Sequence, residues 1–131
     1  STEPDFLKCY FSILEAFIIY NKDLYLAQPE HEKIYDLVVL SIQHINEVNF
    51  QRKAINLLYQ CVQMRDAYQN KTEYSIKTIF ASIPHISSIC QTNLGRIVVI
   101  LMEKLDLKGK ENAVRQLLEY EPYTAVNKDI K

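Results

Sequence analysis

Apolar residues recur every three or four positions along most of the chain, which is the spacing of amphipathic helices. A first helix is predicted from Thr2, a capping hydroxyl ahead of Pro4, and residues 21–23 end or loosen it. We expect its apolar stripe to face a core: Phe6, Tyr10, Ile13, Leu14, Phe17 and Ile18. A second helix is predicted from Pro29, with a buried stripe of Ile34, Leu37, Val38, Ile42 and Ile45.

The same periodicity predicts three helices in the middle of the chain. Asn49 is the expected cap of the third helix, and the polar residues 69–72 close it. Its buried stripe reads Phe50, Ala54, Leu57, Leu58, Cys61 and Val62. A shorter fourth helix covers about residues 73–82. Pro84 starts a fifth, in which Ile86, Ile89 and Cys90 face inward.

Two more helices are expected towards the C-terminal end. The sixth runs from Asn93 to about Leu105 and is apolar on several sides, so we expect it to be the central core element. Its β-branched run at residues 97–100 leaves a strand as the alternative. Gly109 marks a break, and a last helix follows from Lys110 to Tyr120.

The predicted helices pair as one with two, three with four and five, and six with seven. The pairs begin near residues 4, 49 and 93, a recurrence of roughly 44 residues that fits HEAT and armadillo-type repeats. We therefore expect an all-α fold of stacked antiparallel helix pairs, an α-solenoid fragment, with a closed helical bundle as the alternative. Residues 1–131 form one all-helical domain in this interpretation, as a segment of a longer helical-repeat protein.

Composition and charge narrow the function. The net charge is −1 and lysine and arginine form no long run, which makes nucleic-acid binding unlikely on electrostatic grounds. The most apolar stretch, residues 97–102, is too short to span a membrane. Cys9, Cys61 and Cys90 are widely spaced among apolar neighbours, so we expect reduced core cysteines in the cytoplasm or nucleus.

The sequence offers no arrangement typical of an enzyme. Its histidines lie in no catalytic frame; His31 and His85 read as helix-start residues, the first of them solvated, and His44 as a residue near a helix end. Two isolated glycines cannot build a phosphate loop. We therefore expect no catalytic residues, no metal and no cofactor.

One polar line stands out as a candidate binding surface. Glu32, Asp36, Gln43 and Glu47 are spaced so that one face of the second helix would carry all four, opposite its apolar stripe. A solvated helix face is the ordinary interpretation of such a line. The functional interpretation is the inner wall of a solenoid that meets a basic protein surface.

A run of paired apolar positions resembles one family. The first helix reads Asp5-Phe6, Tyr10-Phe11, Ile13-Leu14 and Phe17-Ile18, followed by Leu24-Tyr25-Leu26, Leu40-Ser41-Ile42, Leu57-Leu58 and Cys61-Val62. Over residues 4–62 this order is similar to a repeat pair of the importin-β (karyopherin) superfamily, near its exportin and transportin-SR branches. The resemblance implies a flexible superhelix that binds cargo and the small GTPase Ran, without catalytic residues.

Together these observations predict a non-catalytic protein-binding helical-repeat scaffold. The resemblance implies that this scaffold is a segment of a nuclear transport receptor that binds cargo or Ran. The alternative is a helical scaffold of an unrelated multi-subunit complex, such as RNA-processing or trafficking machinery.

Overall fold

The computed structural model describes residues 4–64 and 66–119, and every regular element in them is helical. The helices are α1 (Pro4–Tyr20), α2 (Lys22–Leu26), α3 (His31–His44), α4 (Val48–Val62), α5 (Thr72–Ser82), α6 (Ser88–Glu103) and α7 (Leu107–Leu118). Short 3₁₀ turns, η1 (Gln69–Lys71) and η2 (Ile83–His85), precede α5 and α6. The predicted cap Thr2 and the predicted helix end Tyr120 lie outside the described residues.

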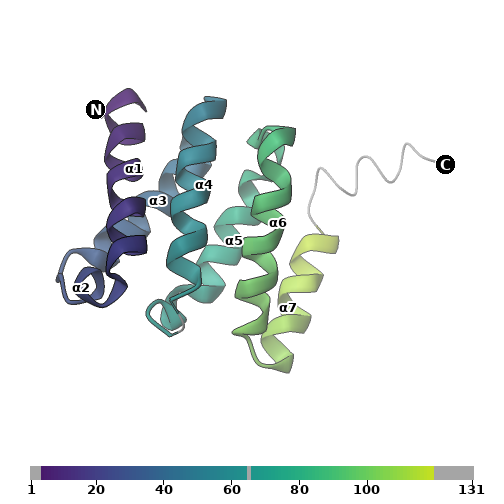
Figure 1. Ribbon diagram of the computed structural model, residues 1–131. Helices are drawn as coiled ribbons and strands as arrows, with labels where there is room; N and C mark the ends of the chain where they lie inside the picture. The colour runs from purple at the N-terminus through teal and green to yellow at the C-terminus, as the bar shows by residue number, and fades with distance from the viewer. Residues whose placement is uncertain (1–3, 65, 120–131) are drawn as a thin grey trace.

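The helices form two layers (Figure 1). In one layer α4 packs against α1 on one side and α6 on the other; in the second layer α5 packs against α3 and α7. The two layers contact each other mainly between α3 and α4 and between α5 and α6. The predicted pairing is therefore wrong in detail, because α1 packs chiefly on α4 rather than α3, and α7 packs chiefly on α5 rather than α6.

The centre of the fold is α4 rather than the predicted sixth helix. The whole predicted stripe of α4 is buried, from Phe50 to Val62, and it contacts α1, α3 and α6. In α6 only Cys90, Leu94, Ile97 and Leu101 are buried. Val99 is 57% exposed, so the β-branched residues 97–100 lie in a helix that is buried on one side only.

The structure corrects the predicted core face of α1. Ile18 of the predicted stripe is buried as expected, but Phe6 and Ile13 are 64% and 60% exposed. Leu7 and Phe11 are buried instead, and each follows a residue of the predicted stripe by one position, a rotation of about 100° on a helix. Both faces have helical periodicity, so the pattern alone could not decide which one packs on α4.

The segment between α1 and α3 also differs from expectation. Asn21 caps the extra helix α2, and its side-chain oxygen accepts a hydrogen bond from the backbone N–H of Leu24 at 3.0 Å. Helix α3 begins at His31, two residues after the predicted start. Tyr35 and Val39 are buried in α3, while Leu37, which was expected in the core, is 37% exposed.

A buried glutamine joins three segments around the start of α4. The Gln51 side chain is fully buried and its amide donates to the carbonyl of His85 at 2.8 Å and more distantly to that of Ile45 at 3.4 Å. The side-chain oxygen of Gln51, Oε1, in turn accepts a hydrogen bond from the backbone N–H of Ser87 at 3.0 Å. This amide fixes the turn before α6 against the base of α4.

The C-terminal boundaries require further corrections. The predicted fifth and sixth helices are the single helix α6, because Gln91 and Thr92 lie on its exposed side and do not interrupt it. Ile89, expected to face inward, is 61% exposed. Gly109 lies inside the first turn of α7, where its N–H donates to the cap Asp106 at 2.7 Å.

Candidate protein-binding surface

The structure separates the four residues of the predicted polar line. Glu32, Asp36 and Gln43 share the outer side of α3, but that helix ends at His44. Glu47 lies beyond it and is the N-cap of α4, the role predicted for Asn49. The expectation that one helix carries all four residues is therefore wrong, since the chain turns to extended backbone at Ile45.

Two of these carboxylates are engaged within the chain. The ammonium group of Lys71 donates to both oxygens of Asp36, at 2.9 and 3.1 Å, and so ties α3 to η1. Glu47 lies 3.6 Å from the ammonium group of Lys8. Both carboxylates are therefore already paired. Glu32 is the charged residue of the line that forms no salt bridge among the described residues.

Glu47 also stabilises the start of α4. Its carboxylate accepts from the backbone N–H groups of Asn49 at 2.9 Å and Phe50 at 2.8 Å. The hydrogen bond from Asn49 and then that from Phe50, with the nearby charge of Lys8, hold the pKa of Glu47 below its ordinary value, while partial desolvation opposes them. This residue therefore has a structural role that the sequence pattern did not indicate.

The outer sides of α3 and α5 form a continuous surface, because these helices pack together and Asp36 meets Lys71 between them. Three large apolar side chains are exposed on it: Leu37 by 37%, Leu40 by 42% and Tyr74 by 43%. The same two helices also expose four charged residues: Glu32, Lys33, Glu73 and Lys77. We call this the α3–α5 surface. Exposed apolar side chains together with charged ones are found at many protein interfaces.

An aromatic cluster beneath this surface fixes the start of α3. The rings of Tyr35 and Tyr68 stack with centroids 4.2 Å apart, and the Tyr35 hydroxyl lies 2.6 Å from the Ser75 hydroxyl. His31 Nδ1 lies 3.1 Å from the Tyr68 hydroxyl, and the two rings meet edge to face. His31 is the first residue of α3, as predicted for a helix-start residue, but it is half-buried and hydrogen-bonded rather than solvated.

Burial keeps the phenols of this cluster neutral. It raises the pKa of Tyr35 to about 12, against the opposing hydrogen bond from Ser75, and raises the pKa of Tyr68 and Tyr25 as well. The Tyr25 hydroxyl is buried and has no hydrogen-bond partner among the described residues. Neutral, tightly packed phenols of this kind stabilise the fold through packing.

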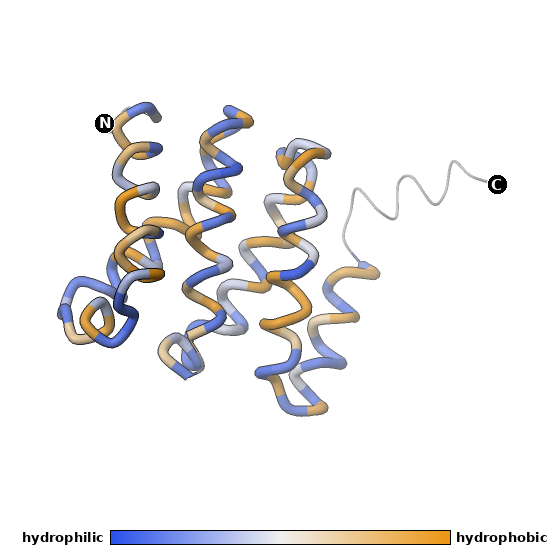
Figure 2. The backbone as a smooth tube through the Cα atoms, viewed as in Figure 1, coloured by the Kyte–Doolittle hydropathy of each residue, from blue (hydrophilic) through white to orange (hydrophobic). Residues whose placement is uncertain are grey.

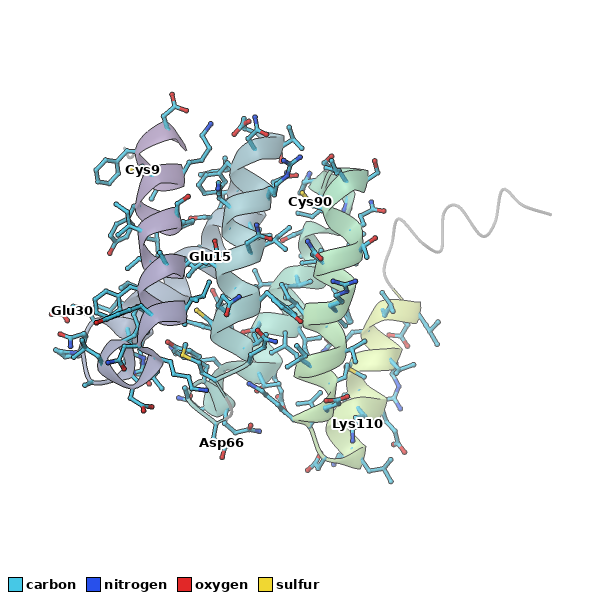
Figure 3. All side chains as sticks on the ribbon, in the orientation of Figure 1. Cys9, Glu15, Glu30, Asp66, Cys90 and Lys110 are labelled. Atoms are coloured by element: carbon cyan, nitrogen blue, oxygen red, sulfur yellow. The ribbon has the colours of Figure 1, made fainter. Side chains whose placement is uncertain are left out.

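The cysteines divide into two kinds. Cys61 and Cys90 are buried as predicted, and burial raises the pKa of the Cys61 thiol to about 12, so this sulfur is neutral at physiological pH. Cys9 is exposed on the outside of α1, which corrects its expected core position (Figure 3). Within residues 4–64 and 66–119, no three His, Cys, Asp or Glu side chains gather in a way that could hold a metal ion.

An open hollow of about 570 Å³ lies where the C-terminal ends of α1 and α4 meet. Its wall combines apolar side chains such as Ile18 and Met64 with the amides of Gln60 and Gln63. Lys22 and Asp23 also line it; both are exposed, and neither forms an ion pair among the described residues.

None of the described helices is both long enough and apolar enough to cross a membrane. Comparison of the chain with known protein families, curated proteins and solved structures finds no match.

Proposed function

We propose that this chain is a non-catalytic protein-binding scaffold built as an α-solenoid of stacked helix pairs. The two-layer arrangement supports this, since within each layer the inner helix packs against a neighbour on each side: α4 against α1 and α6, and α5 against α3 and α7. The helices of the first layer begin at Pro4, Val48 and Ser88, and these intervals fit the period of about 40–47 residues of HEAT and armadillo repeats. A closed bundle remains the alternative architecture.

The α3–α5 surface is the proposed binding surface, and the exposure of Leu37, Leu40 and Tyr74 within it is the observation that carries the proposal. Leucines in the middle of a helix usually face the core, whereas these two interrupt a polar face. Their burial by a partner would remove apolar area from water, and the charges around them would orient that partner.

The nature of the partner stays a prediction from the sequence. A basic protein surface would meet Glu32 directly, while Asp36 and Glu47 would first have to leave Lys71 and Lys8. The proposal that the chain belongs to a nuclear transport receptor, which would bind cargo or Ran in the cytoplasm or nucleus, rests on the family resemblance over residues 4–62. A scaffold of an unrelated multi-subunit complex is the second candidate and uses the same surface.

The proposal is tested by quantitative affinity purification from cell extract with three forms of the chain. Leu40→Asp places a charge in the centre of the α3–α5 surface, and Val99→Asp places one at an exposed position of α6, in the other layer. We expect a partner that the wild type and Val99→Asp retain equally and that Leu40→Asp loses by at least about tenfold.

Equal recovery with both variants would contradict the proposed surface, provided that circular dichroism shows the same helix content in all three proteins. The identity of the partner decides between the two candidates. Ran or nuclear cargo would support the transport receptor, and the subunits of one stable complex would support the unrelated scaffold.

A further inference from the structure

Helix α1 carries a second apolar stripe that the described chain leaves largely exposed. The buried stripe of Leu7, Phe11 and Ile18 packs towards α4. The second stripe lies one residue earlier and consists of Phe6, Tyr10, Ile13, Phe17 and Tyr20. Of these, Phe6, Ile13, Phe17 and Tyr20 are 64%, 60%, 36% and 83% exposed, and Tyr10 is half-buried. We call this the α1 face.

The character of α1 as a whole indicates that the α1 face is covered in the working protein. Figure 2 shows a largely apolar helix at the edge of its layer, and aromatic side chains extend from it on the side away from α4 in Figure 3. Asp5, Lys8 and Glu15 are its charged residues. A helix that is apolar on most sides is normally buried on most sides, and a patch of this kind marks an interface.

The order of residue types in the α1 face is the same in both directions. It reads aromatic, aromatic, isoleucine, aromatic, aromatic, and Phe6 and Tyr20 each lie seven residues from Ile13. When two such helices lie antiparallel about a two-fold axis at Ile13, Phe6 of one copy meets Tyr20 of the other, and Tyr10 meets Phe17. A two-fold interface requires this self-complementarity, since each copy contributes the same patch.

We propose that the α1 face joins two copies of this chain in an antiparallel two-fold dimer. The Phe6 and Tyr10 rings, stacked with centroids 6.2 Å apart, hold one half of the face ready for the other copy. Since a fully accessible aromatic side chain offers about 150–250 Å², the exposed fractions amount to on the order of 500 Å² per copy. This area is at the low end for specific interfaces, so we expect a weak dimer whose formation depends on protein concentration.

Sedimentation equilibrium between about 1 and 300 µM protein tests the dimer. The wild type should shift from the monomer mass of 15.3 kDa towards twice that mass. Ile13→Glu sets two carboxylates against each other at the axis and should raise the Kd at least about tenfold. Val99→Glu, a matched change at an exposed position of α6, should leave the Kd unchanged.

Disulfide trapping tests the two-fold axis itself. In a Cys9→Ser background, which removes the exposed thiol, Ile13→Cys should form a disulfide-linked dimer under mild oxidation and Val99→Cys should not. A wild type that stays monomeric at 300 µM overturns the proposal. Equal trapping at positions 13 and 99 overturns it as well. Head-to-tail stacking would instead give open-ended oligomers, and this result would overturn the proposal. Leu107→Glu in α7 should abolish such oligomers, since Leu107 is 73% exposed at the other end of the array.

Discussion

Replacement of Gln51 by methionine tests how the turn before α6 is held. Methionine has nearly the volume of glutamine, so it leaves no cavity, but it can neither donate to the His85 carbonyl nor accept from the Ser87 N–H. Each polar group left unpaired in a partly buried position costs about 1–3 kcal/mol. We therefore expect Gln51→Met to lower the free energy of unfolding by about 2–4 kcal/mol.

Urea denaturation followed by circular dichroism measures this loss. With a urea dependence of about 2 kcal/mol per molar, the midpoint should fall by about 1–2 M. Gln63→Met is the matched control, because Gln63 is exposed at the C-terminal end of α4, and it should change stability by less than about 0.5 kcal/mol. A loss for Gln51→Met as small as that of the control would refute the reasoning.

Three further changes test other contacts. Leu101→Ala in the buried face of α6 should cost about 2–5 kcal/mol in urea denaturation; below about 1 kcal/mol the helix would be peripheral. Asp36→Asn removes a partly exposed ion pair with Lys71 and should cost only about 0.2–1 kcal/mol, less in 1 M NaCl; an unchanged loss in salt would contradict this. Because the folded-state pKa of Glu47 is lowered, its stabilisation is present above pH about 4.5 and is lost as pH falls through that lowered pKa. The urea midpoint should therefore fall between pH 5 and pH 3, and less steeply in Glu47→Gln; identical slopes would refute the role of Glu47.

The helices with a distinct polar side were the most predictable from the sequence. The stripe from Phe50 to Val62 is buried as predicted, because α4 has a polar side that leaves one choice for its core face. In α1 the pattern was ambiguous, since Phe6 and Leu7 begin two apolar stripes of equal period. Only the packing on α4 decides between them, and that contact joins residues far apart in the chain.

The candidate surface was predictable only in part. The sequence indicated the outer side of α3 through Glu32 and Asp36, but it could not show that Lys71, 35 residues away from Asp36, neutralises that carboxylate. The pattern also gave no indication of the buried amide of Gln51, whose partners are backbone groups just before α4 and before α6. Leu37, which is exposed on α3, was assigned to the core because leucine in a helical stripe usually packs inward.

Site-specific photo-crosslinking in cells tests most directly whether the α3–α5 surface binds a protein. Leu40 is replaced by p-benzoylphenylalanine in one strain and Val99 in another, so that each layer of the fold carries one probe at an exposed position. The proposed function predicts a discrete crosslinked protein from position 40 that is absent from position 99. The same crosslinks from both positions, or none from position 40, would contradict it.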